Sequence, residues 1–265
     1  MESLQTRAKQ TIILMRSNLH SLNNKERKLA EYILANPLAL SGLSIHTLAA
    51  NLGISQGTII HFCQNQGFSG YKEFKEVLAT LPQEFIDEPL QPDFGPLMIA
   101  KSVWDNISKV LDDTLTVLDH DAFNLAVEVL AKSERIDFYA RGGSARIAEN
   151  AARKFVRWGH HVTFYRDSPQ QKLSASQLPK GSVAIGITYS GKTPEVLDCL
   201  AVAKKRGAFC IVITSCQRSP AAELGDVVLL SAIRGPEMFN ENEFSKIAQI
   251  AILDALYFNF IKNDL

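Results

Sequence analysis

The chain has 265 residues and carries 28 basic and 28 acidic side chains, so its formal net charge is zero. This length is sufficient for one large or two modest domains, each with its own core. The balanced charge excludes a global attraction to nucleic acid or membrane, so any such binding surface must be local. The four cysteines have no C-x-x-C or zinc spacing, and we predict reduced core thiols, no metal site and no cofactor: Cys63, Cys199, Cys210 and Cys216.

The distribution of helical and strand patterns predicts two domains. Residues 4–78 show helical periods and no convincing strand. Four prolines then interrupt an acidic segment, which is poor helix material and typical of a linker. From about residue 101, helical stretches alternate with short apolar strands, as in a parallel α/β domain. We predict an all-α domain over residues 1–80, a Pro-rich linker over 81–100, and a three-layer α/β domain with about five parallel strands over 101–265.

A helix-turn-helix is predicted within the first domain. Ser44 can cap a helix over residues 45–52, Gly53 supplies the turn, and Ser55 can cap a second helix from residue 56 to about 66. A small residue at the helix crossing and apolar anchors beneath the second helix complete the pattern: Ala49, Ile59 and Phe62. Spacing alone leaves an ordinary helical hairpin open as the alternative.

The same region resembles a known family. Residues 54–75, ISQGTIIHFCQNQGFSGYKEFK, closely resemble the signature of the N-terminal domain of RpiR-type bacterial transcription regulators. Residues 22–37, LNNKERKLAEYILANP, resemble the preceding helix of that family. The resemblance implies that the second helix enters the major groove of a double-stranded DNA operator. It assigns DNA contacts to six residues: Ser55, Gln56, Gly57, Thr58, His61 and Lys72.

The expected DNA-reading helix departs from the family at one position. Ser55 and Thr58 match the family pattern, but His61 stands where an arginine is usual, and residues 64–66 lack the common lysines and arginines. An uncharged helix neither attracts the DNA phosphates nor forms a bidentate contact with guanine, so we expect a modest affinity for DNA. Residues 1–80 carry eight basic and five acidic side chains, a net charge of +3 that mildly favours DNA.

A phosphate-binding turn is predicted between residues 182 and 206. An apolar run over residues 183–187 suits a central parallel strand, and a helix starts at Pro194 with Thr193 as its cap. Between them, Thr188, Ser190 and Gly191 crowd hydroxyls and a flexible backbone into one turn. Such a turn at a helix N-terminus is an anion site, because backbone N–H groups and the positive end of the helix dipole converge there.

A nucleotide P-loop competes for this stretch. Residues 186–193, GITYSGKT, satisfy the pattern G-x-x-x-x-G-K-[ST]. Three features argue against it: Gly186 lies inside the apolar run, Pro194 falls where a P-loop helix needs an N–H, and no acidic magnesium ligand ends the other expected strands.

The turn instead resembles the S-x-S-G-x-T loop of the sugar isomerase (SIS) fold, with a threonine replacing the first serine. Residues 141–144, RGGS, resemble the first ligand loop of that family, and residues 235–237, GPE, resemble the segment that carries a catalytic glutamate in aminosugar isomerases. The resemblance implies phosphosugar binding by seven residues: Gly143, Ser144, Thr188, Ser190, Gly191, Thr193 and Glu237. Because RpiR-type regulators join both domains, the resemblance covers nearly the whole chain.

The C-terminal region holds the longest apolar stretch, residues 247–261. It contains Gln249, Asp254 and Asn259, which indicates an amphipathic or buried helix rather than a membrane span. The first seven residues, MESLQTR, lack the layout of a signal peptide. We expect a cytoplasmic protein with no membrane partner.

The resemblance implies a DNA-binding transcriptional regulator of carbohydrate metabolism, not an enzyme, whose SIS domain senses a phosphorylated sugar or sugar acid. Ligand would bind one arrangement of a homodimer or homotetramer better and shift the spacing of its DNA-reading heads. Two alternatives stay open. One is a phosphosugar isomerase with a helical assembly domain, for which Glu237 is the lone carboxylate candidate, and the other is a binding protein that has lost DNA recognition.

Overall fold

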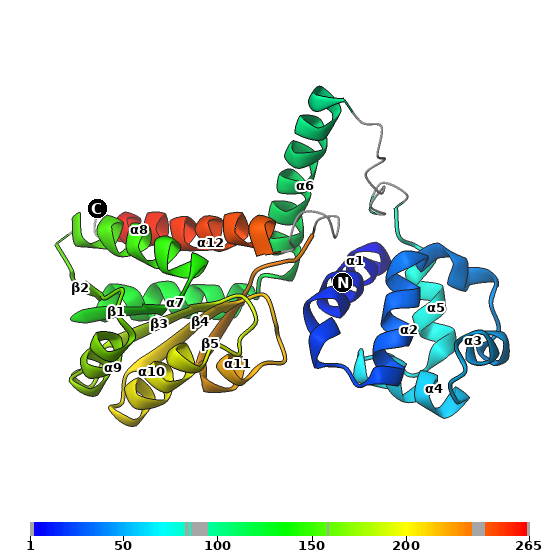
Figure 1. The fold of residues 1–265 in the computed structure, drawn as a ribbon, viewed down its shortest axis with the longest axis horizontal. Helices are drawn as coiled ribbons and strands as arrows, with labels where there is room; N and C mark the ends of the chain where they lie inside the picture. The colour runs from blue at the N-terminus through cyan, green and yellow to red at the C-terminus, as the bar shows by residue number, and fades with distance from the viewer. Residues whose placement is uncertain (1–2, 83–84, 86–94, 158, 235–241, 264–265) are drawn as a thin grey trace. The chain divides into compact units, whose positions relative to one another are not determined.

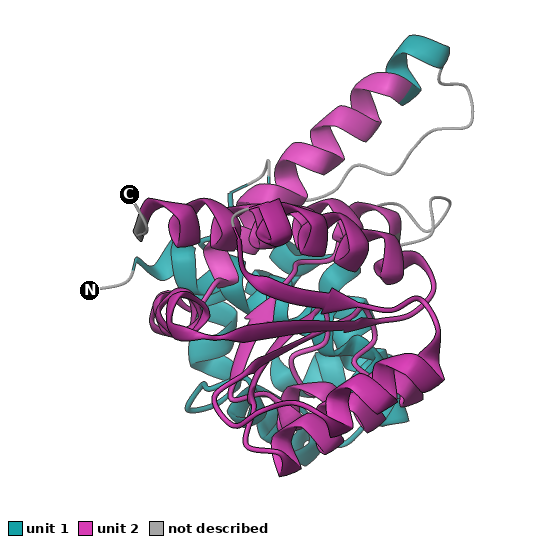
Figure 2. Cartoon of the chain, turned by 90° about the vertical axis from the view of Figure 1, so that its left-hand side faces the viewer, with its two compact units in different colours: residues 1–99 teal, residues 100–265 magenta. Residues whose placement is uncertain are grey.

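The computed structural model describes residues 3–82, 85, 95–157, 159–234 and 242–263. The chain divides into two compact units, Met1–Ile99 and Ala100–Leu265, which are coloured separately in Figure 2. Most of the predicted linker, residues 81–100, lies outside the described residues.

Unit 1 is helical throughout its described part (Figure 1). Ser3, Asn23, Ser44 and Ser55 each accept a hydrogen bond from a first-turn N–H, so four of its helices start at a capping side chain. The order is α1 Leu4–Asn18, the 3-10 turn η1 Leu19–Ser21, α2 Asn24–Ala35, the 3-10 turn η2 Pro37–Gly42, α3 Ile45–Leu52, α4 Gln56–Asn65 and α5 Tyr71–Leu78.

A polar and aromatic cluster fixes the end of α4 against α1 and α5. The Arg7 guanidinium donates to the Glu73 carboxylate at 2.6 Å and to the Gly67 carbonyl at 2.9 Å, and it lies 4.3 Å from the centre of the Phe68 ring. The backbone N–H and the hydroxyl of Ser69 also donate to Glu73. These Ser69 hydrogen bonds, with Arg7, lower the pKa of Glu73 to about 2. The segment after α4 is thus held from both neighbouring helices.

Unit 2 is built on a five-stranded parallel sheet with the order β2-β1-β3-β4-β5. The strands are β1 Arg135–Ala140, β2 His161–Phe164, β3 Val183–Thr188, β4 Phe209–Thr214 and β5 Val227–Leu230. Every residue of β3 is buried, because helices cover both faces of the sheet. The observed sheet confirms the predicted α/β class and strand number.

Two helical layers enclose the sheet (Figure 1). One face packs against α7 His120–Lys132, α8 Gly143–Arg157 and α12 Asn242–Asn263, and the other against α9 Ser168–Ser176, α10 Pro194–Lys205 and α11 Pro220–Leu224. Alternate strand residues supply the two cores: Ile185 faces the first layer and Ala184 the second. The long helix α6 Pro96–Val117 has its buried residues only in its C-terminal half, at Val110, Asp113 and Thr114.

The helix α12 belongs to the core of unit 2. Its stretch Glu243–Lys262 is long and apolar enough to cross a membrane by length and composition, yet 44% of its most apolar window is buried. Leu256 and Phe260 pack in the core against α8, where the rings of Phe155 and Phe260 lie at a tilted angle of 52° with their centres 5.1 Å apart. It is therefore a core helix, as the polar residues within it predict.

The strand order creates a topological switch point. The chain leaves β1 for β2 on one side and returns to β3 on the other, so β1 and β3 are neighbours with their carboxyl ends at the same edge. Ala140 ends β1 opposite Ile187, one residue before the end of β3. Ligands of open α/β sheets bind in the crevice at such a point. Both predicted ligand loops that the structure describes start there.

Candidate functional site

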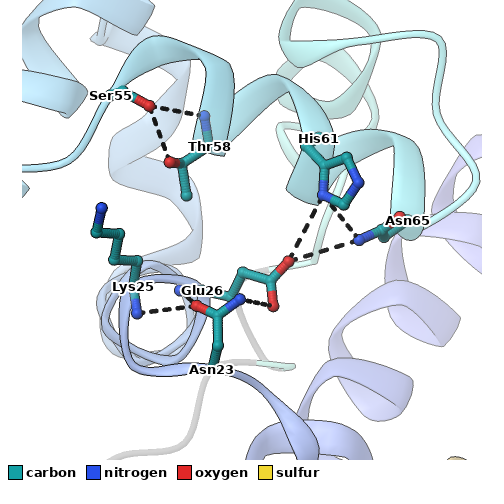
Figure 3. Close-up of polar contacts among 7 residues, drawn as sticks. All are labelled: Asn23, Lys25, Glu26, Ser55, Thr58, His61 and Asn65. Carbon is teal, nitrogen blue, oxygen red and sulfur yellow. Dashed lines mark hydrogen bonds and ion pairs between the residues drawn. The ribbon is translucent and has the colours of Figure 1, made fainter.

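The helix-turn-helix of unit 1 has the predicted local geometry. Gly53 ends α3 in the left-handed conformation with φ of +63°, which a side chain would strain. The Ser55 hydroxyl accepts from the Thr58 N–H at 3.1 Å and pairs with the Thr58 hydroxyl at 2.9 Å (Figure 3). Ile59 and Phe62 are buried on the inner face of α4. The turn and the capped start of α4 are thus set by local sequence.

The opposite face of α4 is exposed to solvent. Four of the predicted DNA-contact residues are exposed on it, namely Ser55, Gln56, Gly57 and His61. Thr58 is half-buried and shares its hydroxyl with the helix cap. Lys72 is exposed on α5. Apart from Lys72, the predicted residues therefore lie on α4 or at its N-cap, and their contacts with DNA stay a prediction.

An acidic residue that the sequence analysis did not single out lies beside His61. One oxygen of the Glu26 carboxylate on α2 is 3.7 Å from His61 Nδ1 and accepts from Asn65 Nδ2 at 3.5 Å (Figure 3). The other oxygen accepts from the cap residue Asn23 at 2.7 Å. The Asn23–Glu26 spacing is that of a capping box, the one sequence signal for this side chain.

In unit 2, the turn between β3 and α10 is held closed by its own hydroxyls. Thr188 and Thr193 pair at 2.9 Å between their hydroxyl oxygens, and the Ser190 hydroxyl accepts from the Lys192 N–H at 3.2 Å. Thr193 occupies the cap position of α10, as predicted, but its side chain makes no cap hydrogen bond. Pairing with Thr188 takes its place, so the first turn of α10 lacks a side-chain cap.

The neighbouring strand fixes this turn in place. The Thr214 hydroxyl and the Ser215 N–H both donate to the Tyr189 carbonyl, at 3.2 Å and 3.0 Å. The Ala221 N–H donates to the Gly191 carbonyl at 3.0 Å. Gly191 has φ of +64°, and a Cβ on it would lie 2.0 Å from the Ser219 hydroxyl oxygen. Only glycine fits at this position. Because the hydrogen bonds from Thr214, Ser215 and Ala221 already hold the backbone, the turn is preorganised before any ligand arrives.

The sequence of residues 186–193 satisfies the P-loop pattern, but their structure is not that of a P-loop. Gly186 lies within β3, where a Cβ would come within 2.7 Å of a Leu200 methyl group, so this glycine lets α10 pack on the sheet. The helix begins at Pro194, after the lysine and threonine of the pattern. Among the described residues, no three His, Cys, Asp or Glu side chains come together as metal ligands do.

The turn between β1 and α8 forms the other side of the switch point. Gly142 has φ of +56°, and α8 begins at Gly143, so Ser144 lies in the first helical turn and is 9% exposed. A Cβ on Gly143 would lie 2.9 Å from Cε and 3.1 Å from Nζ of Lys246, a residue of α12. This lysine was not predicted, because only the fold brings α12 to this turn. It places a lysine, ion-paired with Glu243 at 2.5 Å, beside the predicted ligand residues.

A buried glutamine holds the start of this turn. At Ala140 the strand β2 has already ended, and Gln171 of α9 takes the place of a strand partner. Its side-chain amide accepts from the Ala140 N–H at 3.2 Å and donates to the Ala140 carbonyl at 3.0 Å. It also donates to the Tyr165 carbonyl at 2.6 Å. An ion pair of 3.3 Å between Arg141 and Glu195 then joins this turn to the first turn of α10.

Known proteins resemble the chain over both units. Residues 9–84 match the helix-turn-helix domain of the rpiR family, and residues 129–258 match the SIS domain. An uncharacterized HTH-type transcriptional regulator of Caldanaerobacter subterraneus is 32% identical and aligns over 93% of this chain and 88% of that protein. The chain belongs to the RpiR family of helix-turn-helix transcriptional regulators. HexR of Pseudomonas aeruginosa is 31% identical over 91% of this chain and 86% of that regulator.

Solved structures share the fold of this RpiR-family chain. The Vibrio vulnificus NanR protein complexed with ManNAc-6P has a TM-score of 0.59 at 24% identity and covers 96% of this chain and 92% of that one. The sugar isomerase domain of an RpiR transcription factor from Sphaerobacter thermophilus has a TM-score of 0.58 at 22% identity and covers 63% and 91%. The resemblance predicted from sequence is thus confirmed for family and fold.

In this RpiR-family protein, six of the seven predicted ligand residues lie on the two turns at the switch point. Glu237 lies outside the described residues. The segment that leads to it is anchored, because the Arg234 guanidinium forms a buried ion pair with Asp113 of α6. The Ala232 N–H also donates to the Thr114 hydroxyl at 3.1 Å.

Proposed function

We propose that this protein is a ligand-responsive transcriptional regulator of carbohydrate metabolism. Unit 1 reads a double-stranded DNA operator through α4, and the SIS domain senses a phosphorylated sugar or sugar acid. The observation that carries the proposal is the turn from Thr188 to Thr193, a preorganised set of hydroxyls and amides at the start of a helix without a side-chain cap. A dianionic phosphate suits that site, because it accepts from several donors and complements the helix dipole.

Each of the two turns contacts a different part of the ligand. Ser190, Thr193 and the Gly191 N–H hold the phosphate, and Ser144 with the backbone at Gly143 contacts the sugar from the β1 side. Lys246 lies next to Gly143 and is ion-paired with Glu243 at 2.5 Å, so a polar group of the ligand on that side meets a Lys–Glu pair. The NanR structure with ManNAc-6P, although related at only 24% identity, supports phosphosugars as the ligand class.

The DNA-binding part rests on the exposed face of α4. Ser55, Gln56, Gly57 and Thr58 form the first turn that approaches the base edges, with His61 one turn further along. Lys72 contributes a phosphate contact from α5. The protein acts in the cytoplasm as a homodimer or homotetramer that pairs two reading heads on one operator. Ligand binding shifts the relative populations of its arrangements.

Thermal unfolding of the full chain tests the ligand class. A panel of phosphosugars is compared with the unphosphorylated parent sugars, for the wild type and for Ser190→Ala. A ligand that binds only the native state adds about 2.7 kcal/mol of stability at a hundredfold excess over Kd, a readily measured shift. Ser176→Ala is the control, because that exposed hydroxyl donates to the Leu173 carbonyl on α9, away from the switch point.

We expect one phosphosugar to raise the melting temperature of the wild type and of Ser176→Ala, but not of Ser190→Ala. Equal shifts with the unphosphorylated parent would contradict the phosphate role of the turn. Steady conversion of the bound phosphosugar into its isomer, followed by NMR, would favour the isomerase alternative over a sensor.

A further inference from the structure

A carboxylate lies next to the helix that the proposed function assigns to DNA. Glu26 of α2 is close to His61 and Asn65 on α4, and its side chain is 14% exposed (Figure 3). A negative charge near a DNA-reading helix repels the phosphate backbone. We therefore ask which contact of Glu26 near α4 requires a carboxylate and would be lost with a neutral side chain.

The two oxygens of the Glu26 carboxylate have different partners. One oxygen accepts from Asn23 Nδ2 at 2.7 Å, while the Glu26 N–H donates to the Asn23 side-chain oxygen at 3.0 Å. This reciprocal pair links the N-cap and N3 positions at the start of α2, with the Asn23 side-chain amide in place of the backbone N–H that a capping box uses. The other oxygen faces α4 and accepts from Asn65 Nδ2 at 3.5 Å. Glu26 thus links the start of α2 to the exposed side of α4.

The contacts of Asn65 determine which nitrogen of His61 carries the proton. Asn65 Nδ2 lies 3.1 Å from His61 Nδ1, and an amide nitrogen can only donate. His61 Nδ1 is then the acceptor, so the neutral imidazole carries its proton on Nε2. The Glu26 carboxylate holds this arrangement, because a flipped Asn65 would turn its carbonyl oxygen toward another negatively charged oxygen.

The outer part of the His61 ring is open to solvent. Its side chain is 68% exposed, and Nε2 makes no hydrogen bond within the described part of the chain. A single N–H donor in the major groove can be accepted by N7 of a purine, which both guanine and adenine present there. An arginine at the same position would offer two donors to guanine. The single donor of the histidine does not distinguish guanine from adenine, but it still requires an acceptor on the base.

We propose that Glu26 is a positioning residue that acts through Asn65 and holds the His61 ring so that its Nε2–H donates a hydrogen bond to a purine N7 in the operator. The inference rests on the proposed function, since it requires that α4 reads DNA. The acidic side chain beside the DNA defines the tautomer of the reading histidine. Its loss removes one element of sequence recognition while leaving the fold of α4 intact.

The experiment starts with the full chain and a selection of bound fragments from a random duplex library, which yields the preferred operator. Each purine of that operator is then replaced by its 7-deaza analogue, which lacks only the N7 acceptor. For the wild type we expect one position in each half-site where the replacement weakens binding about tenfold, the loss of one hydrogen bond.

Variants then assign this effect to His61 and Glu26. His61→Ala and Glu26→Ala should each reduce the 7-deaza penalty to within about twofold, and the double variant should lose no more than either single one. Glu31→Ala removes the same charge from the same helix, where Glu31 pairs only with Arg27 in the described residues, and should keep the tenfold penalty. Asn23→Ala removes the cap of α2 but leaves the oxygen that faces α4, and should keep it too.

The possible outcomes separate this inference from the proposed function. If selection enriches an operator but Glu26→Ala retains the full 7-deaza penalty, the positioning role is wrong. If no purine in the enriched operator shows a penalty for the wild type, His61 does not read N7 and the inference falls. If no fragment is enriched at all, the DNA-binding function itself fails, and the inference fails with it.

Discussion

The turn between β3 and α10 leaves no space for a side chain at Gly191, and Gly191→Ala measures how tightly that turn is built. Its φ of +64° costs a residue with a Cβ about 1–2 kcal/mol. The new methyl group would also lie 2.0 Å from Oγ and 2.3 Å from Cβ of Ser219. Overpacking of that kind adds about 1–3 kcal/mol. We therefore expect a total loss of about 2–5 kcal/mol in the free energy of unfolding.

Gly181→Ala separates the two contributions. Gly181 also has a positive φ, +86°, but a Cβ there would meet nothing within 4 Å. It should cost only the conformational part, about 1–2 kcal/mol. Urea unfolding followed by tryptophan fluorescence suits the comparison, because both tryptophans, at positions 104 and 158, lie in unit 2.

A second-site change identifies the clashing side chain. Ser219→Gly removes the two nearest atoms that the new methyl group would meet and leaves Thr214 Oγ1 at 3.3 Å, and glycine at a helix cap costs only a few tenths of a kcal/mol. The double variant with Gly191→Ala should recover most of the overpacking cost. If Gly191→Ala is no more destabilising than Gly181→Ala, the turn is looser than the structure indicates and the reasoning is refuted.

Three further predictions concern charge and burial. The pKa of Glu73, about 2, lies below its unfolded value of about 4.3, so its contribution is complete above about pH 4.5 and declines as the pH falls toward 2. Glu73→Gln should therefore be less stable than the wild type at pH 7 by urea unfolding followed by circular dichroism, and the gap should close near pH 2. Arg234→Met leaves the buried Asp113 unpaired and should cost about 3–5 kcal/mol by fluorescence-monitored unfolding, most of which Asp113→Leu in the same chain should restore. Burial raises the pKa of Cys63 to about 12 and also raises that of the other three thiols, so the native protein at pH 8 should react with a disulfide reagent only at its rate of unfolding.

Features set by neighbouring residues were predictable from sequence. The caps at Ser44 and Ser55 and the left-handed Gly53 lie within a few residues of the helices they bound, so their spacing determines the helix-turn-helix. The five strands were predictable for a related reason, because a sheet covered on both faces requires continuous apolar runs. Gly186 was correctly placed inside a strand on the same grounds.

Contacts between distant segments were not predictable. Lys246 meets Gly143 only because α12 crosses the start of α8, and no local pattern encodes that crossing. Gln171 completes β1 because the pairing with β2 ends two residues before Ala140, which depends on tertiary packing. Thr193 shows the limit most directly, since its cap position follows from sequence but the partner of its hydroxyl does not.

We propose that ligand binding in unit 2 and DNA binding by unit 1 are coupled. The most direct measurement is the affinity of the full chain for its selected operator, with and without a saturating concentration of the phosphosugar that raises its melting temperature. We predict a change in the operator Kd of about 5- to 150-fold, which Ser190→Ala abolishes without altering the affinity in the absence of ligand. An operator Kd that stays the same while both ligand and DNA bind would contradict the account.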